Sequence, residues 1–364
     1  MKLLIVDTYY PSFLHGFYAA HPELQSRHYA EQWRILMDQC FGTADFYSDS
    51  LRSVGFDAHE VVVNCDPLQR RWAREHALPL WAAYPLYRRS GRVKAWQMAV
   101  LKAQVEKLRP DVLYVQDLNW METPLLQAVT KKGRLIVGQT AYVIRQDMNW
   151  EPYDLIVSSF PHYVENFREM GMKSEYLRFA FEPRVQKLLG DVQPRRDVAF
   201  VGGYSPNHAN GNRLLEHVAA KTTVDFWGYG AESLPANSFV RRSCRGEAWG
   251  LQMYGVLAES RISLNRHIDV AGRFANNMRL FEATGVGTLL LTDQKDNLHQ
   301  LFELGKEVIA YNTPQECSEL IAYYLDHEDE RRAVARAGQA RTLRDHTYQL
   351  RMKELAQIVR EHQA

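Results

Sequence analysis

The stretch DVAFVGG, residues 197–203, restarts a pattern midway along the chain that the N-terminus has already begun. It is a short apolar run that leads into two glycines, much as the run KLLIV at 2–6 leads into Asp7. A helical segment at 211–220 follows, and further strands are expected at 224–230, 261–265, 287–293 and 307–311. Short apolar strands that alternate with helices are typical of parallel βα units with helices on both faces of the sheet.

The first half of the chain shows the same alternation. Strands are expected at 2–6, 60–64, 111–117, 134–140 and 154–159, and helical segments at 26–54 and 93–108. The sequence therefore predicts an α/β protein with two Rossmann-like parallel-sheet domains that face a central cleft. We expect the first domain at 1–182, a linker at 183–196 and the second domain at 197–347. An amphipathic helix at 348–364 is expected to pack back toward the N-terminal domain.

Composition narrows the classes of function. The 364 residues are 46% hydrophobic and 24% charged, with a net charge of +1, so no strong field favours nucleic acid or an acidic membrane. The four cysteines lie far apart and contain no CxxC pair, which favours neither zinc nor a disulfide framework. No apolar run is long enough for a membrane span, and the N-terminus reads as a strand rather than a signal peptide. We expect a cytosolic monomer or homodimer.

Ligands of open α/β sheets bind beyond the carboxyl ends of the strands, so the loops after each strand are the candidates. Gly202 and Gly203 follow a strand and precede a helix, where backbone N–H groups can approach an anion. Their spacing fits neither GxGxxG nor a P-loop. Arg213, in the first turn of the next helix, is placed to contact a diphosphate or to remain solvated. Gly228 and Tyr229 follow the next strand and offer either a surface for a nucleobase or a simple turn.

The loop NRHIDVAGRFANN at 265–277 is the most polar of these segments. A polar loop after a buried strand is typical of a ligand-binding segment. Asn277 is predicted to cap a short helix that begins at Met278 and points its N–H groups at a phosphate. Arg279 and Glu282 lie three residues apart on that helix, either as a weak surface ion pair or as the polar face of a ligand site. The donor-site candidates in this region are Asn265, Arg266, His267, Asn276, Asn277, Arg279 and Glu282.

The first half offers fewer candidates. His15 is a possible acid–base group or acceptor contact. Asp117 is a general base, a contact for an acceptor hydroxyl, or a helix N-cap. Gly16, Asn119 and Gln139 also follow strands and are expected to bind an acceptor. The acidic run DHEDE at 326–330 lies in a helical context, so it predicts a helix junction rather than a metal site. No metal and no cofactor are expected.

The segments NNMRLFEATGVGTLLLTDQKDNLHQLFELGKEVIAY (276–311) and YYLDHEDERRAVARAGQARTLRDHTYQLRMKEL (323–355) resemble the C-terminal domain of CgeB-like, spore-maturation-type glycosyltransferases. The resemblance covers roughly 195–355 and includes DVAFVGG; the first half is similar in architecture alone. It implies the GT-B fold, a nucleotide-sugar donor in the second domain, a glycan or small-molecule acceptor on the first, and transfer without a metal. In this resemblance Glu282 takes the place of the ribose-binding acid and Arg213 that of the cation beside the leaving phosphate.

One position departs from the family's pattern. Retaining relatives of the family-1 and family-4 type carry a second acidic residue eight positions before Glu282, where this sequence has Phe274. The expected function is transfer of a sugar from a nucleotide-sugar, with UDP as the expected nucleotide and retention as the outcome that the resemblance implies. A GT-B-shaped sugar-nucleotide epimerase or hydrolase, and an inactive nucleotide-sugar-binding protein, are the alternatives.

Overall fold

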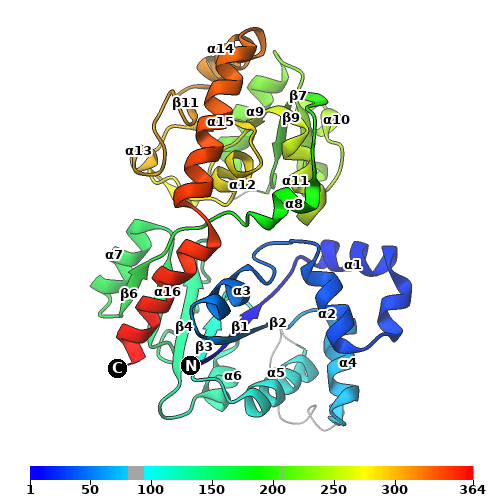
Figure 1. Ribbon diagram of the computed structural model, residues 1–364, viewed down its shortest axis with the longest axis vertical. Coiled ribbons are helices and arrows are strands. Elements are labelled where there is room, and N and C mark those ends of the chain that lie inside the picture. The colour runs from blue at the N-terminus through cyan, green and yellow to red at the C-terminus, as the bar shows by residue number, and fades with distance from the viewer. Residues whose placement is uncertain (81–93, 206–207, 364) are drawn as a thin grey trace. The chain divides into compact units, whose positions relative to one another are not determined.

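The computed structural model describes residues 1–80, 94–205 and 208–363, and the chain divides into two compact units. The first unit comprises Met1–Leu177 together with the C-terminal residues from Met352 onward, and the second comprises Arg178–Arg351. Each unit contains one parallel sheet covered by helices (Figure 1). The predicted architecture of two Rossmann-like parallel-sheet domains is therefore confirmed.

The sheet of the first unit has six parallel strands in the order β2-β1-β3-β4-β5-β6. Its strands are β1 (Lys2–Asp7), β2 (Asp57–Val62), β3 (Val112–Val115), β4 (Leu135–Thr140), β5 (Leu155–Ser158) and β6 (Ser174–Tyr176). Its helices are α1 (Pro11–Ala20), α2 (Tyr29–Met37), α3 (Phe46–Ser53), α4 (Asp66–Glu75), α5 (Ala95–Leu108), α6 (Thr123–Val129) and α7 (Pro161–Glu169), and the 3-10 helix η1 spans Pro22–Ser26. Because β1 lies between β2 and β3, its carboxyl end is flanked on both sides.

The sheet of the second unit has five parallel strands in the order β11-β10-β9-β7-β8. Its strands are β7 (Arg196–Val201), β8 (Asp225–Trp227), β9 (Ser260–Leu264), β10 (Leu289–Asp293) and β11 (Ile309–Tyr311). Its helices are α8 (Arg184–Leu189), α9 (Ala209–Ala219), α10 (Phe239–Ser243), α11 (Gly250–Ala258), α12 (Arg279–Gly285), α13 (Leu298–Leu301), α14 (Pro314–Asp326) and α15 (Glu328–Asp345). The 3-10 helices η4 (Ala231–Ser233) and η5 (Asp269–Ala271) complete the unit, and α16 (Tyr348–Gln363) ends the chain.

The central strands are buried along their whole length, which explains why they read as apolar runs rather than alternating patterns. Every residue of β3 and of β5 is buried, and in β10 only the last residue, Asp293, keeps partial exposure. Helices on both faces of a parallel sheet leave no solvent-facing side for polar residues. Polar residues consequently gather where the strands end.

One local expectation was wrong, one strand was not foreseen, and the expected helix at 93–108 is confirmed as α5. The helical region expected at 26–54 is two helices, α2 and α3, because the chain turns between them through Cys40, Gly42 and Ala44, all with positive φ. Strand β6 was not expected, since only three residues at the edge of the sheet form it. The expected helix at 93–108 begins at Ala95, and residue 93 lies outside the described residues.

The expected linker at 183–196 is also different in the structure. It contains α8, whose Val185 is fully buried and whose Gln186 Nε2 donates to the carbonyl of Gly285, 2.9 Å away. These contacts place α8 in the second unit, and the boundary falls after Leu177 rather than after residue 182. The terminal helix is α16, as predicted, and the residues from Met352 onward belong to the first unit. In Figure 1 the end of α16 (red) lies beside β6, where His362 Nε2 is 3.2 Å from Glu175 Oε1.

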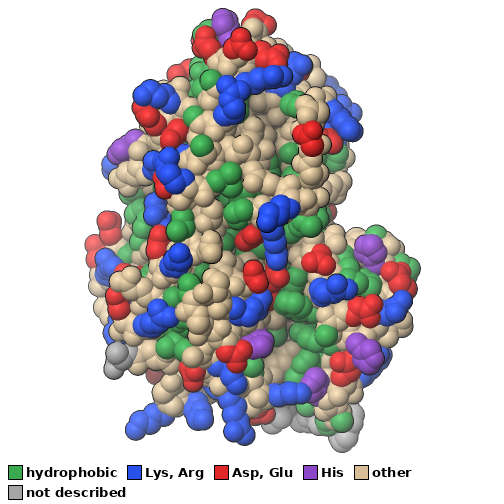
Figure 2. Space-filling model, viewed as in Figure 1, with side chains coloured by type: hydrophobic (Ala, Val, Ile, Leu, Met, Phe, Trp, Pro, Cys, Tyr) green, Lys and Arg blue, Asp and Glu red, His purple; other side chains and the backbone are tan. Residues whose placement is uncertain are grey.

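The surface carries charged side chains of both signs, interspersed over the face drawn in Figure 2. Such mixing agrees with the net charge of +1 and gives no single-sign field. In the described part of the chain, no helix combines the length and apolar character that a bilayer span requires. No group of three or more His, Cys, Asp or Glu side chains among residues 1–80, 94–205 and 208–363 is arranged to hold a metal ion. The acidic run at 326–330 lies where α14 ends and α15 begins, so the predicted helix junction is confirmed.

Candidate functional site

The two glycine loops of the second unit pack against each other at the carboxyl edge of its sheet. The N–H of Gly202 donates to the carbonyl of Trp227 over 3.0 Å, and Tyr204 N–H donates to the carbonyl of Tyr229, also over 3.0 Å. Gly228 has φ of +136°, and a Cβ there would lie 1.7 Å from the carbonyl oxygen of Gly202. Gly228 is therefore required for this close approach, and its Cα does not offer the open surface for a nucleobase that the sequence suggested.

Gly203 also makes a close contact, in this case with the side chain of Tyr229. A Cβ on Gly203 would lie 2.6 Å from Cζ of Tyr229, so the tyrosine ring covers the glycine. The ring of Tyr229 in turn stacks on Trp249, with ring centroids 5.8 Å apart. The glycines of both loops thus permit tight packing, and they bring two aromatic rings to the edge of the sheet.

Arg266, directly after β9, is the buried cation of this region. It is 6% exposed, and its Nη2 donates to the carbonyl of Gly203 over 2.6 Å and to Asn212 Oδ1 over 3.0 Å. Burial lowers the pKa of Arg266 to about 10, so the guanidinium stays charged at neutral pH. Among the described residues no carboxylate forms an ion pair with it, and its buried Nε has no hydrogen-bond partner. A buried cation without a counter-ion beside a glycine loop favours an anionic ligand.

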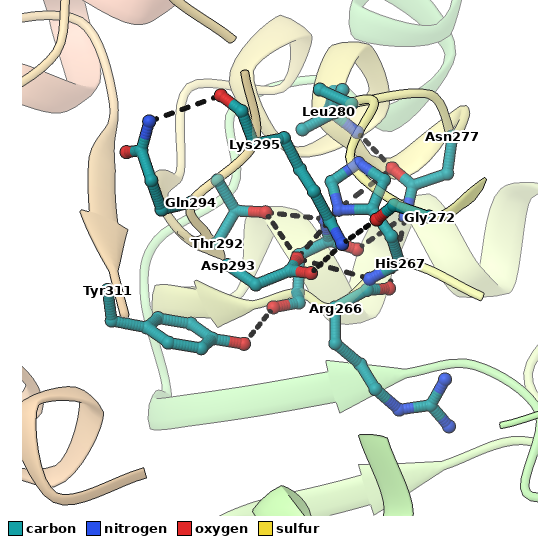
Figure 3. A network of polar contacts seen from close by, with 12 residues as sticks. Arg266, His267, Gly272, Asn277, Leu280, Thr292, Asp293, Gln294, Lys295 and Tyr311 are labelled. Atoms are coloured by element: carbon teal, nitrogen blue, oxygen red, sulfur yellow. Dashed lines mark hydrogen bonds and ion pairs between the residues drawn. The ribbon is translucent and has the colours of Figure 1, made fainter. Parts of the chain in front are cut away.

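His267, the next residue, has a fully buried side chain that is hydrogen-bonded to Asp293 at the end of β10. His267 Nδ1 lies 2.6 Å from Asp293 Oδ1, which also accepts the backbone N–H of His267 over 3.1 Å. Lys295 Nζ lies 3.2 Å from Asp293 Oδ2 and donates to the carbonyl of Gly272 over 2.7 Å. Burial raises the pKa of Asp293, but His267 and Lys295 outweigh it and hold this pKa at about 2. Figure 3 shows the pair, with the Arg266 guanidinium extending away from it.

Asparagine side chains join the ends of β9 and β10 to the start of α12. Asn265 Nδ2 donates to Thr292 Oγ1 over 2.9 Å, and Asn265 Oδ1 accepts from Asn277 Nδ2 over 2.9 Å. Asn277 Oδ1 accepts the backbone N–H of Leu280 over 3.2 Å, so the predicted capping contact exists, although α12 begins at Arg279. Asn276 is buried, and its Nδ2 has no partner among the described residues. These amides fix the loop that carries Arg266 and His267.

Arg279 and Glu282 form neither a surface pair nor an open polar face. Arg279 Nη1 is 2.6 Å from Glu282 Oε2, and the two side chains are 14% and 6% exposed. The hydroxyl of Tyr254 lies 3.5 Å from Glu282 Oε1. Burial raises the pKa of Glu282, and Arg279 and Tyr254 act against that rise. The pair therefore holds α12 within the unit, and the carboxylate that was expected at the ribose already has two partners.

Arg213, the cation expected at the leaving phosphate, is not part of this network. It is exposed on α9, and its guanidinium donates to Asn210 on the same helix. Arg266 packs closely against the first turn of α9, because a Cβ on Gly211 would lie only 1.9 Å from Arg266 Cδ. Arg213 follows Gly211 by two residues, so it lies on a different face of the same helix, and it is exposed. Phe274, at the position of the second acidic residue, is partly buried.

The first unit has a pair of carboxyl groups at the carboxyl edge of its sheet. Asp7 ends β1, and Asp117 follows β3, which is the neighbouring strand. Thr8 Oγ1 donates to Asp117 Oδ2 over 2.5 Å, and the Thr8 N–H donates to Asp7 Oδ1 over 2.7 Å. Asp117 Oδ1 accepts the N–H of Trp120 over 3.1 Å. Because residues 118–120 form a turn and the next helix begins at Thr123, Asp117 caps a turn rather than the helix that was expected.

A cavity of about 720 Å³ is lined by residues of the first unit alone. Its walls include His15 and Tyr18 from α1, Asn64 after β2, Asp66 from α4 and Trp120. His15 therefore does line a cavity, as an exposed side chain on α1 rather than in a loop. Aromatic and polar walls of this kind suit a hydroxylated ligand.

The three expected acceptor residues have other positions. Gly16 is exposed within α1, with nothing within 4 Å of the site of a Cβ. Asn119 connects two loops, since its Nδ2 donates to Val143 O over 2.9 Å and its Oδ1 accepts the N–H of Arg145 over 3.1 Å. Gln139 is 7% exposed and bonds to the hydroxyls of Tyr114 and Tyr47 inside the core. The prediction that Gln139 binds an acceptor is wrong, because its side chain is buried in the interior of the first unit.

Sequence reasoning missed Asp7, Asp293 and Lys295. Each lies at or just after the end of a strand, where the candidate loops were expected in general from the sequence. The signal was the polar residue that ends an apolar run, as in KLLIVD and LLLTD. Such a residue was taken as the end of the strand rather than as part of the site.

Residues 207–357 match a protein-family model described as Glycosyl transferase-like. The matched range includes α9 to α15 and therefore most of the second unit. A search of curated proteins finds no match to the sequence. The second unit thus carries a glycosyltransferase-like domain.

The whole chain is similar in fold to solved GT-B structures. HepE from Anabaena in complex with UDP-glucose is 12% identical, covers 99% of this chain and 100% of its own, and has a TM-score of 0.59. A sucrose-phosphate synthase from Thermosynechococcus elongatus is 9% identical, with coverages of 99% and 98% and a TM-score of 0.59. A candidate UDP-N-acetylglucosamine 2-epimerase from Listeria monocytogenes is 10% identical, with coverages of 99% and 96% and a TM-score of 0.51. At these identities the likeness concerns the fold alone.

Proposed function

We propose that the protein is a glycosyltransferase of the CgeB-like kind, which transfers a sugar from a UDP-linked donor to an acceptor hydroxyl without a metal ion. The observation that carries the proposal is Arg266, a buried guanidinium with no carboxylate partner among the described residues, next to the Gly203 loop. Breaking a sugar–phosphate bond develops negative charge on the diphosphate, and a preorganised cation in a dry site stabilises that charge. The family match to the second unit and the UDP-glucose complex of HepE support the choice of donor.

The chain's residues have separate parts in this mechanism. Arg266 binds the diphosphate and neutralises the charge that the leaving group gains. The His267–Asp293–Lys295 group holds the loop that carries Arg266, and the amides of Asn265 and Asn277 hold the same loop from the side of α12. Tyr229, stacked on Trp249, supplies an aromatic face at the same edge of the sheet. Ribose binding by Glu282, which the resemblance implies, would require the carboxylate to leave Arg279.

Retention of anomeric configuration is the outcome that the resemblance implies, and the residues add no support to it. The second acidic position holds Phe274, so the carboxylate that retaining relatives place there is missing. NMR of the anomeric proton in the product distinguishes retention from inversion. A His or carboxylate pair placed around the sugar would favour the epimerase or hydrolase alternative. His267 pairs with Asp293, but its side chain is fully enclosed, so the structure does not favour that alternative.

The test is the melting temperature with and without UDP, GDP, dTDP or CMP. We expect UDP to raise it in wild type and in Arg213→Met, whereas Arg266→Met should abolish the rise. Arg213 is exposed on α9 whereas Arg266 is buried against Gly203, so Arg213→Met is a control that removes one arginine charge of the same unit. The rise should persist in EDTA if transfer needs no metal. No rise with any nucleotide would refute the donor site, and a rise without release of UDP from any UDP-sugar would favour the inactive binding protein.

A further inference from the structure

A cavity of about 430 Å³ lies in the first unit beside β2, the strand at the edge of its sheet. Lys2 and Leu4, from the first half of β1, line this cavity, so it lies toward the amino edge of the sheet. None of its walls is shared with the 720 Å³ cavity, and the proposed transfer chemistry uses none of them. Its polar walls therefore point to a separate role.

Glu60 of β2 is the buried acid of this cavity. It is 5% exposed, and neither Oε1 nor Oε2 has a hydrogen-bond partner among the described residues. Burial raises the pKa of Glu60 to about 8, with Ser48 and Arg52 nearby acting against the rise and Asp49 and Asp7 adding to it. A buried carboxyl group without partners costs free energy unless a ligand or solvent supplies them.

A chain of amides fixes a further open acceptor on the same wall. Gln69 Nε2 donates to the carbonyl of Val62 over 2.9 Å, which leaves Gln69 Oε1 to accept from Gln104 Nε2, also over 2.9 Å. Gln104 Oε1 is then buried without a partner among the described residues. The buried polar atoms of this cavity that lack partners in the described part of the chain are thus all oxygens, and a ligand here has to donate hydrogen bonds.

Aromatic rings supply the apolar walls of the cavity, which are Tyr29, Trp33 and Trp72. Trp72 already stacks on His76, with ring centroids 4.0 Å apart. Trp33 is half-buried, and no ring or cation of the described residues stacks on it, so its ring is available to a ligand. A flat apolar face beside acceptor oxygens suits a sugar ring, which has C–H groups on its faces and hydroxyls at its edge.

The charges around the cavity favour a neutral ligand. Lys2 and Arg52 are already paired with aspartates, and Lys107 is exposed, so the buried Glu60 faces no free cation that would hold a phosphate. The same three cations disfavour a positively charged ligand. A hydroxyl both donates and accepts hydrogen bonds, so it fits Glu60 with or without a proton, whereas an ammonium group requires the ionised form.

We propose that this cavity binds a neutral saccharide, whose hydroxyls donate to Glu60 and Gln104 and whose ring lies on Trp33. The cavity volume of about 430 Å³ is within the range of small-molecule sites. This saccharide site is additional to the proposed glycosyltransferase site and does not depend on it.

The experiment is saturation-transfer-difference NMR of the full chain with glucose, galactose, N-acetylglucosamine, maltose and cellobiose at millimolar concentration, without a nucleotide-sugar. Uridine monophosphate and choline are the anionic and cationic control probes. We expect at least one saccharide to bind, and Glu60→Gln should weaken its Kd ~10-fold or more, because the carboxyl acceptor is lost. Trp33→Leu should weaken it several-fold. Glu106→Gln, an exposed glutamate of α5 that does not line the cavity, is the matched control and should keep the wild-type affinity.

Four results would overturn the proposal. They are no binding of any of the five saccharides, binding that Glu60→Gln and Trp33→Leu leave unchanged, Glu60-dependent binding of uridine monophosphate or choline instead of a saccharide, and loss of saccharide binding in His15→Ala but not in Glu60→Gln. The last result would place the saccharide in the 720 Å³ cavity. Because no donor takes part, failure of the proposed transferase function leaves this measurement unaffected, and the UDP-induced rise in melting temperature tests that function separately.

Discussion

Arg279→Met tests whether the charged pair on α12 is structural. The methionine keeps much of the volume of the arginine stem but leaves the Glu282 carboxylate buried with only the Tyr254 hydroxyl, 3.5 Å away. The ion pair has an N–O distance of 2.6 Å, with Arg279 14% exposed and Glu282 6% exposed. The variant also loses the hydrogen bond that Arg279 Nε donates to the carbonyl of Val201 over 3.3 Å.

Removal of one partner from a buried pair costs ~3–5 kcal/mol, because the other charge stays buried and unpaired. We expect Arg279→Met to lower the free energy of unfolding by about 3 kcal/mol at pH 7.5. The pKa of Glu282 is already raised by burial, so its contribution to stability is most favourable below the unfolded pKa and falls as pH rises through the folded pKa. Loss of Arg279 raises this pKa further. The deficit of the variant should therefore be largest at alkaline pH and smallest near pH 5.

The assay is urea unfolding followed by tryptophan fluorescence, with a double-mutant cycle through Glu282→Gln. The double variant should lose less stability than the sum of the losses of the two single variants, because with both charges removed no unpaired charge stays buried. A loss within ~0.5 kcal/mol for Arg279→Met, the size expected of a surface pair, would refute the reasoning. Two further substitutions that change neither member of the pair test other contacts.

Gly211→Ala should lower stability by ~1–3 kcal/mol and abolish the UDP-induced rise in melting temperature, because its Cβ would lie 1.9 Å from Arg266 Cδ. Gly255→Ala is the control, a helical glycine with nothing within 4 Å, and equal effects of the two substitutions would contradict the packing of Arg266. Glu60→Gln should raise stability at pH 8 by about 3 kcal/mol, since burial raises the pKa of Glu60 to about 8. Wild type should lose stability as pH rises from about 5 to 8, whereas the variant should not, and parallel pH profiles in urea unfolding would show that Glu60 is not buried as described.

Much of the architecture followed from the sequence because its causes are local. An apolar run such as VLYV in β3 must be covered on both faces, and the order of such runs and helices along the chain predicts two parallel sheets. The polar residues that follow the runs were correctly expected at one edge of each sheet, and Asn277 makes its predicted contact at the start of α12. Short or edge elements such as β6 and α8 were missed because three to six residues carry too little periodicity.

The roles of individual side chains depended on contacts between residues far apart in the chain. The sequence placed Arg213 in the first turn of a helix and Arg266 in a polar loop, and only the structure shows that Arg266 is the buried one, packed against Gly211. The sequence likewise contained Asp7 and Asp117 at the ends of two strands. The pairing of β1 with β3 places them so that Thr8 donates hydrogen bonds to both. Periodicity and turn residues report local burial, whereas the charge, exposure and pKa of a group depend on neighbours that only the folded chain supplies.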